Sequence, residues 1–331
     1  MPDWPPYPSG PFTGEFVVGG FGGSPFQACK WVMNQSALVV KGLDVWYNSS
    51  FLRGVQVTFS DDSRSNIFGT PSDTHATVTF VPGERITSLT LWGNGNGTRT
   101  GRIRLTTSAG QTFDVGKNTN GQTAYEAGVA SGILVGMVGR CGNDIDMLGP
   151  VFLNGVVTNI SISDVVYNPP LTGSAGISQM TLDRVHYVNP PNAKQDLPWT
   201  FDNSLTRVAS TTFSQSTGTT YGISVSTEVS AELFGIGGKI GSTYTWQRTE
   251  TTETSTSTSF EKVLAWGISG DLKPGEGITA TSFCQQGVGQ ANYMSTVTLR
   301  LSDGTVSTYK EPGVFSNVVY TEAEVTTEPD N

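Results

Sequence analysis

The chain has 331 residues, enough for two domains with their own cores, and carries 40 glycines, 17 prolines and 14% charged residues. This composition, with many short alternating runs and no convincing helical period, predicts an all-β protein with turn-rich connections. The formal net charge of -9 argues against a nucleic-acid partner and against recruitment to an anionic membrane by charge alone.

The N-terminal residues and the cysteines say little about where in or outside the cell the protein acts. Residues 1–13 are rich in proline and predict an irregular arm. No signal peptide is recognisable in this form, and no stretch is long and apolar enough for a transmembrane helix. Three alternatives stay open: the protein is secreted and its signal was removed, its export is unconventional, or it is stored in the cytoplasm. Cys29, Cys141 and Cys284 are too widely spaced for a disulfide framework or a metal site, so we expect free thiols.

Short apolar runs separated by Gly, Asp, Ser and Asn clusters fill the first half of the chain. The expected strands are 16–18, 38–40, 43–47, 55–59, 76–80, 86–92, 103–106 and 133–138. Spacing of this kind predicts a barrel, sandwich or prism rather than a parallel sheet.

Two glycine-rich segments, 19–23 and 139–149, have the composition of ligand-binding loops. Glycines let the backbone approach a ligand closely, and consecutive N–H groups can point into one pocket. A carboxylate such as Asp146 can accept two sugar hydroxyls while neighbouring amides donate to other oxygens. Neither loop fits the phosphate-binding patterns. The alternative interpretation is a pair of tight turns.

These loops, together with Glu84-Arg85-Ile86 and residues 102–107, closely resemble the jacalin-related lectins over about residues 14–153. The resemblance implies a β-prism of three four-stranded sheets that binds a monosaccharide, often mannose-like, between the two glycine loops. Carried over by position, Gly23, Asn143 and Asp144 would supply backbone N–H groups, and Asp146 would supply the carboxylate. Cys141 stands where a hydroxyl residue is common, and Asn143 replaces a frequent acidic residue, but both keep the backbone donors. The loop 93–99 is expected to line the same end.

The domain boundary follows Gly149-Pro150, and we place it near residue 153. The predicted organisation is a Pro-rich arm over 1–13, a jacalin-like domain over 14–153 and a second module over 154–331.

An amphipathic hairpin is the strongest physical pattern in the second module. Apolar residues recur at alternate positions before and after Gly237-Gly238, which predicts two strands that share one apolar face. With these glycines at the turn, Ala231 would face Tyr244 and Val229 would face Trp246. The apolar set is Tyr221, Ile223, Val225, Val229, Ala231, Leu233, Phe234, Ile236, Ile240, Tyr244 and Trp246. The opposite face carries Glu228, Glu232 and Lys239.

Ser/Thr-rich segments, 211–220 and 249–259, flank this hairpin on both sides. Long polar strands that enclose a short amphipathic hairpin suit a barrel with a watery wall and a lipid-facing band, for which each arm has roughly the ~9–11 alternating residues needed. The alternative is an ordinary exposed hairpin on a soluble sheet, flanked by low-complexity linkers.

In architecture, residues 154–331 resemble the aerolysin-type β-pore-forming module, and the whole chain resembles the lectin-headed aerolysin-like proteins. The resemblance implies an all-β chain in which a β-prism precedes an elongated sheet module with a pre-stem hairpin. It also implies a protein that docks on cell-surface glycans, oligomerises with copies of itself and inserts the hairpins into a lipid membrane. Glu228, Glu232 and Lys239 would then face the pore lumen.

Enzymatic chemistry is not expected. The chain has two histidines, no cluster with metal-ligand spacing and no Gly-x-Ser-x-Gly elbow, so neither a catalytic site, a metal nor a cofactor is predicted. Asp144 and Asp146 could suggest a glycosidase, but two positions apart on one loop they fit ligand binding better. The competing hypothesis is a non-lytic, multivalent lectin whose C-terminal module serves as an oligomerisation or stalk domain.

Overall fold

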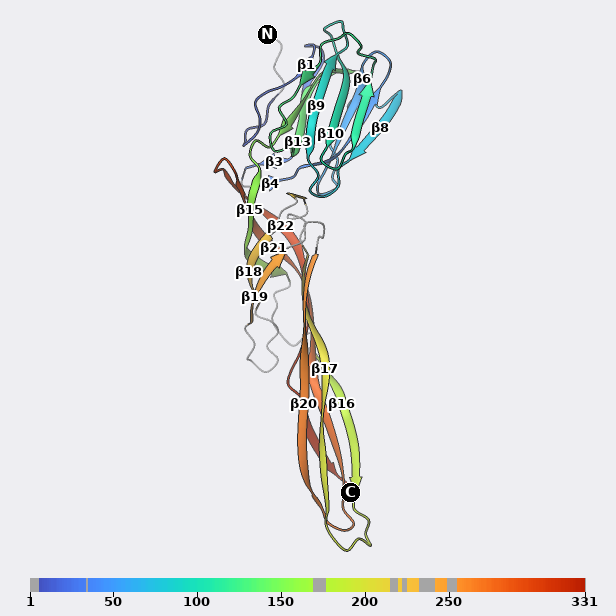
Figure 1. Ribbon diagram of the computed structural model, residues 1–331, viewed down its shortest axis with the longest axis vertical. Helices are drawn as coiled ribbons and strands as arrows, with labels where there is room; N and C mark the ends of the chain where they lie inside the picture. Colours follow the sequence, from blue (N-terminus) through green and yellow to red (C-terminus); the bar gives the residue numbers. More distant parts are fainter. Residues whose placement is uncertain are drawn as a thin grey trace.

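The computed structural model describes residues 6–33, 35–168, 177–214, 220–221, 225–231, 242–248 and 255–330. It is an elongated all-β molecule with a wide body at one end of the long axis and a narrow tail of long strands at the other (Figure 1). Within the described part of the chain, no helix has the length and apolarity needed to cross a membrane. The all-β class expected from the sequence is confirmed.

The N-terminal domain is a prism of three four-stranded antiparallel sheets, in the orders β1-β14-β13-β2, β11-β10-β9-β12 and β7-β6-β5-β8, with a small β3-β4 ribbon beside them. Its strands are β1 (Val18–Gly19), β2 (Ser24–Cys29), β3 (Trp31–Val32), β4 (Ser36–Ala37), β5 (Val40–Tyr47), β6 (Leu52–Phe59), β7 (Phe68–Gly69), β8 (Thr74–Thr79), β9 (Ile86–Gly93), β10 (Thr100–Thr107), β11 (Thr112–Gly116), β12 (Tyr125–Glu126), β13 (Leu134–Cys141) and β14 (Ile145–Phe152).

Alternation explains why these strands close into a prism. One side of each strand is apolar and packs inward, and the three inner faces meet in a core that includes Leu43, Val57, Leu91, Ile103 and Leu148, all without exposed surface. Two expectations differ from the structure. Residues 16 and 17 precede β1, and residues 38 and 39 lie between β4 and β5, because pairing with neighbouring strands begins only at Val18 and Val40.

The second module is one long sheet of nine strands. Its strands are β15 (Val157–Asn168), β16 (Ile177–Val188), β17 (Leu197–Ser214), β18 (Val225–Ala231), β19 (Ser242–Arg248), β20 (Ser255–Leu272), β21 (Gly277–Leu301), β22 (Val306–Tyr320) and β23 (Glu324–Pro329). The order is β19-β18-β15-β21-β22-β17-β20, and β16 and β23 also pair with β21.

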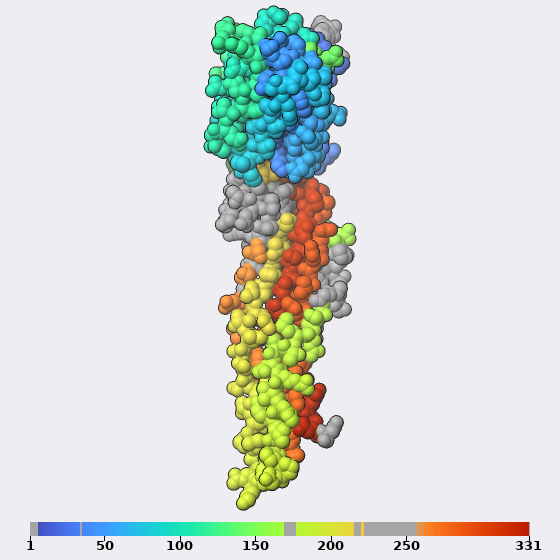
Figure 2. Space-filling model, turned by 90° about the vertical axis from the view of Figure 1, so that its right-hand side faces the viewer, coloured from blue at the N-terminus to red at the C-terminus, as the bar shows by residue number. Residues whose placement is uncertain are grey.

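The 25-residue strand β21 is the backbone of this module. Its C-terminal part pairs with β15 and β22 near the prism, and its N-terminal part pairs with β16 and β23 in the tail. The described parts of the Ser/Thr-rich flanks, 211–214 and 255–259, belong to β17 and β20, which pair with each other along 18 residues. Figure 2 shows β16 and β17, green and yellow, reaching the end of the molecule opposite the blue prism.

A shared core joins the prism to the module. One apolar cluster contains prism residues such as Trp31, Val39 and Leu153 together with module residues such as Leu299 and Phe315. Because this cluster is continuous, the prism and the adjoining part of the sheet are packed as one body.

Candidate functional site: the glycine loops of the prism

The two glycine-rich loops meet at one end of the prism, as expected. An open depression there is lined by Phe21, Gly22, Gly23, Gly97, Thr98, Arg99, Gly142, Asn143, Asp144 and Asp146. All four residues predicted to bind sugar are in this set, and the loop 93–99 lines the same end.

Glycine is required at two positions of the first loop. Gly23 has φ +58°, and a Cβ there would collide with the backbone of Cys141. A Cβ on Gly22 would collide with the carboxylate of Asp146. The loop can therefore lie directly against Asp146 only because both residues lack a side chain.

Arg140 fixes the loop in place. From β13 its Nε donates to the carbonyl of Gly22 at 2.9 Å, and an Nη donates to the carbonyl of Gly23 at 2.6 Å. The backbone N–H of Gly20 donates to the carbonyl of Asp146 at 2.8 Å. These bonds satisfy the carbonyls of the loop and leave it preorganised for a ligand.

Asp144 and Asp146 have different surroundings although two positions separate them. The Asp144 carboxylate forms ion pairs with Arg53 and, at 2.8 Å, with Arg99. Burial raises the pKa of Asp146, while Arg99 and a backbone N–H of Gly142 act to lower it. Asp144 is thus a structural anchor, whereas Asp146 is the carboxylate that can accept hydrogen bonds from a ligand.

Sequence reasoning missed the ion pairs of Asp144 with Arg53 and Arg99, although it expected the loop that ends at Arg99 to line this end. Arg53 lies 91 residues from Asp144 along the chain and Arg99 lies 45 residues from it. The half-exposed ring of Phe21, at 49% exposure, adds an aromatic surface to the rim. The local sequence pattern that could have predicted this aromatic surface is the position of Phe21 between glycines, because it places a bulky side chain at the tip of a turn.

The hairpin is present, but its register was predicted wrongly. Val229 pairs with Tyr244 and Ala231 with Ser242, a shift of two residues from the register that places Gly237-Gly238 at the turn. A shift of two preserves the side of the sheet to which each position points, so Val225, Val229, Ala231, Tyr244 and Trp246 still occupy one face by alternation. Glu228 pairs with Thr245 on the other face. Seven predicted positions lie outside the described residues: Ile223, Glu232, Leu233, Phe234, Ile236, Lys239 and Ile240.

Tyr221 differs from the rest of the predicted apolar set. It is not part of a strand, and it is completely buried between the prism and the module. The expectation that the alternating strand includes Tyr221 is therefore wrong in this form of the protein.

The remaining reactive side chains are used structurally. His75 stacks on Trp46 with ring centroids 4.6 Å apart and contacts Asp44 at 2.9 Å, and His186 contacts Asp330 at 2.8 Å. All three cysteines are free, as expected. Within the described ranges, no group of three or more His, Cys, Asp or Glu side chains is placed to hold a metal ion.

A separate cavity of about 290 Å³ lies at the opposite end of the prism. Strands β9 and β13 begin at Ile86 and Leu134, which line this cavity, and run toward the glycine loops. At about 3.3 Å per residue, their eight residues separate the two sites by roughly 25 Å. Thr220 also lines the cavity, so it lies at the contact with the module.

Comparisons with known proteins agree with this architecture. Residues 17–151 match the family model of the jacalin-like lectin domain. No curated protein matches the sequence. The crystal structure of lamprey immune protein superposes with a TM-score of 0.73 at 24% identity, covering 97% of this chain and 100% of that one.

Two further solved structures match smaller parts of the chain. A non-toxic crystal protein from Bacillus thuringiensis has 13% identity and a TM-score of 0.39 over 52% of this chain and 84% of its own. Malaysian banana lectin has 23% identity and a TM-score of 0.34 over 42% of this chain and 95% of its own. Residues 17–151 thus match the jacalin-like lectin domain, and the fold of the whole chain is similar to that of lamprey immune protein.

Proposed function

We propose that this protein binds cell-surface glycans through the glycine loops and then forms a membrane pore from the β18–β19 hairpins of several copies. The glycan-binding half rests on the jacalin-like domain and on the preorganised depression around Asp146. We further propose that the protein acts without enzymatic chemistry, as a released soluble protein that meets a target membrane.

The observation that carries the pore-forming half is how lightly the hairpin is attached. Among the described residues, two pairs, Ile160–Val225 and Ser161–Ser226, join β18 to the main sheet. By contrast, β18 and β19 form seven pairs with each other. The hairpin is thus a unit that can leave the sheet while keeping its own pairing.

Membrane insertion requires several copies. A lone hairpin in lipid would leave the backbone N–H and C=O groups of its outer edges unpaired, which is costly in hydrocarbon. A closed barrel from a ring of copies removes those edges. The apolar positions of β18 and β19 would then face lipid, and the face of Glu228 would line the lumen.

Dye release tests this proposal against the non-lytic lectin. The protein is added to liposomes that carry mannose-rich glycolipid and an encapsulated dye, with glycan-free liposomes as the control. Pore formation predicts release from the glycan-bearing liposomes together with detergent-resistant oligomers. Agglutination of the liposomes without release would support the stalk function of the second module and contradict the pore.

A further inference from the structure

Tyr221 occupies the junction of the prism, the module and the base of the hairpin. Its ring meets Trp31 of β3 edge to face, with centroids 6.3 Å apart, and its hydroxyl donates to the carbonyl of Ala37 in β4 at 2.7 Å. From the module side, Tyr309 of β22 is hydrogen-bonded to the same hydroxyl and Glu311 lies close enough to act on its charge. The side chain is therefore bonded to both domains.

The backbone of Tyr221 is also held by the prism. The guanidinium of Arg85 donates to the Tyr221 carbonyl and to the carbonyl of Gly83 at 3.0 Å. Burial lowers the pKa of Arg85, a sign that this guanidinium is withdrawn from water. A charged donor in a partly dry site forms stronger hydrogen bonds than a neutral one, so this contact adds to the anchor.

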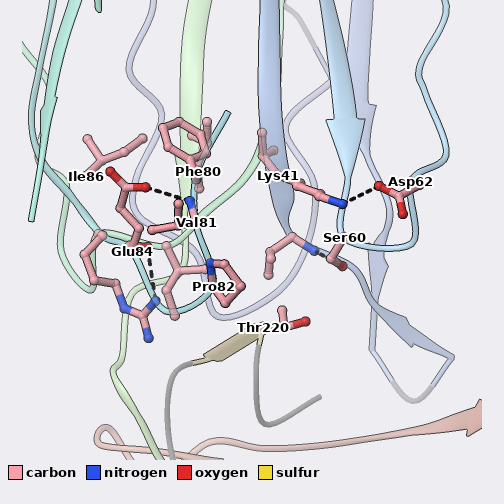
Figure 3. A pocket seen from close by; sticks show the side chains of 15 residues that line it. Lys41, Ser60, Asp62, Phe80, Val81, Pro82, Glu84, Ile86 and Thr220 are labelled. Atoms are coloured by element: carbon pink, nitrogen blue, oxygen red, sulfur yellow. Dashed lines mark hydrogen bonds and ion pairs between the residues drawn. The ribbon is translucent and has the colours of Figure 1, made fainter. Parts of the chain in front are cut away.

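The neighbouring residue has a different environment. Thr220 lines the cavity of about 290 Å³ beneath the prism, opposite Ser60 and Pro82 (Figure 3). Tyr221 is therefore packed on every side, against both domains, whereas Thr220 borders the cavity.

Tyr221 lies four positions before the first residue of β18, and two residue pairs link β18 to the main sheet in the part of the chain that the structure describes. We propose that Tyr221 is an interdomain latch, which holds the base of the β18–β19 hairpin against the body until the contact between prism and module is loosened. The latch is a property of the soluble form. Its role in releasing the hairpin for insertion rests on the proposed pore-forming function.

Hydrogen–deuterium exchange of the 331-residue chain in solution tests the latch without a membrane. Tyr221→Phe removes the hydroxyl and keeps the ring, so the fold should survive. We expect exchange in β18 and β19 to accelerate about tenfold, because a buried hydroxyl loses its hydrogen bonds. Strands of the prism such as β9 and β13 should keep their wild-type rates.

Tyr187→Phe is the matched control. The Tyr187 hydroxyl donates to the carbonyl of Thr200 at 2.7 Å, the same type of bond as that of Tyr221, but within the tail. This variant should leave exchange in β18 and β19 unchanged. Equal rates in the two variants, or an acceleration spread evenly over all strands in Tyr221→Phe, would overturn the latch.

Dye release then separates the latch from the proposed function. If the wild type forms pores, Tyr221→Phe should release dye faster at equal glycan binding, and unchanged release kinetics would contradict a gating role. If the wild type releases no dye, the pore-forming proposal fails, while the exchange experiment still decides whether Tyr221 restrains the hairpin.

Discussion

At the scale of single residues, the two aspartates of the sugar loop show how surroundings assign roles. Asp144 is held by two guanidinium groups, and Asp146 lies against the backbone of the glycine loop. Both carboxylates lie at the open depression, but the Asp144 carboxylate is bound by the two arginines, whereas the Asp146 carboxylate accepts a hydrogen bond from the backbone N–H of Gly142.

Replacing Asp146 should abolish most glycan binding. Asp146→Ala removes a carboxylate that can accept two sugar hydroxyls, and each charge-assisted hydrogen bond contributes ~1.5–3 kcal/mol. We expect retention on a mannose-type column to fall more than tenfold, with an unchanged circular dichroism spectrum. Asp61→Ala, on an exposed turn far from the loops, is the control. Undiminished binding by Asp146→Ala would show that the sugar does not contact this residue.

Glycan binding should also weaken on acidification. Burial raises the pKa of Asp146, so the folded free protein takes up a proton at a higher pH than an ordinary aspartate, whose pKa is about 3.9. The protonated carboxyl loses acceptor capacity, and affinity should therefore fall as the pH drops through this raised pKa. Binding measured by calorimetry between neutral and acidic pH checks the direction. Asp146→Asn should bind weakly with a flatter pH profile, and an equally steep profile in that variant would assign the titration to another group.

At the scale of elements, the proposed function requires the hairpin to separate from the main sheet. A cysteine pair at Ser161 and Ser226 would tether them, because paired positions on neighbouring strands are about 4.8 Å apart, within reach of a disulfide. The oxidised double variant should bind glycan normally and release no dye, and reduction should restore release.

Single variants Ser161→Cys and Ser226→Cys control for the new thiols, since Cys29, Cys141 and Cys284 are already free. Continued dye release by the fully oxidised double variant would place the membrane segment elsewhere in the chain.

At the scale of the whole molecule, the sugar loops and the tail lie at opposite ends of the long axis (Figure 1). Because the core between prism and module is continuous, the prism and the adjoining part of the module sheet form one body. Binding of a surface glycan at the loops would therefore orient the whole chain, with the tail pointing away from the glycan.

The ring proposed above should favour cations. Glu228 lies on the face opposite Val229 and Tyr244, and in a closed barrel it would recur once per subunit and form an acidic ring with Glu232. Lys239 adds one positive charge per subunit, against the two negative charges of Glu228 and Glu232. Under a salt gradient in planar bilayers, the wild type should give a reversal potential of cation-selective sign. Glu228→Lys with Glu232→Lys should move it toward anions.

The opposite arrangement, with the glutamates facing lipid, predicts a different result. If the glutamates faced lipid, removing their charge would improve insertion, since charges in contact with the hydrocarbon are costly. A double variant that still forms pores with an unchanged reversal potential would rule out the lumen assignment.

Local patterns in the sequence were sufficient for the fold class, the meeting of the glycine loops and the faces of the hairpin. Alternation with a period of two depends only on neighbouring residues, so the face of Val229 and Tyr244 survived a register error of two. The glycines of the first loop likewise reflect a local cause, because there is no space for a Cβ beside Asp146.

Contacts between distant parts of the chain were decided only by the tertiary structure. Tyr221 bonds to Ala37 across 184 positions, and Arg53 reaches Asp144 across 91. No periodicity encodes such pairs, because they depend on how separate sheets dock and not on which face of a strand is apolar. By pattern alone Tyr221 is one more apolar residue of a strand, whereas packing places it in the interdomain core. The sequence by itself determined the all-β class and the glycine loops that meet at one end of the prism, while docking of the two domains determined the contacts of Tyr221.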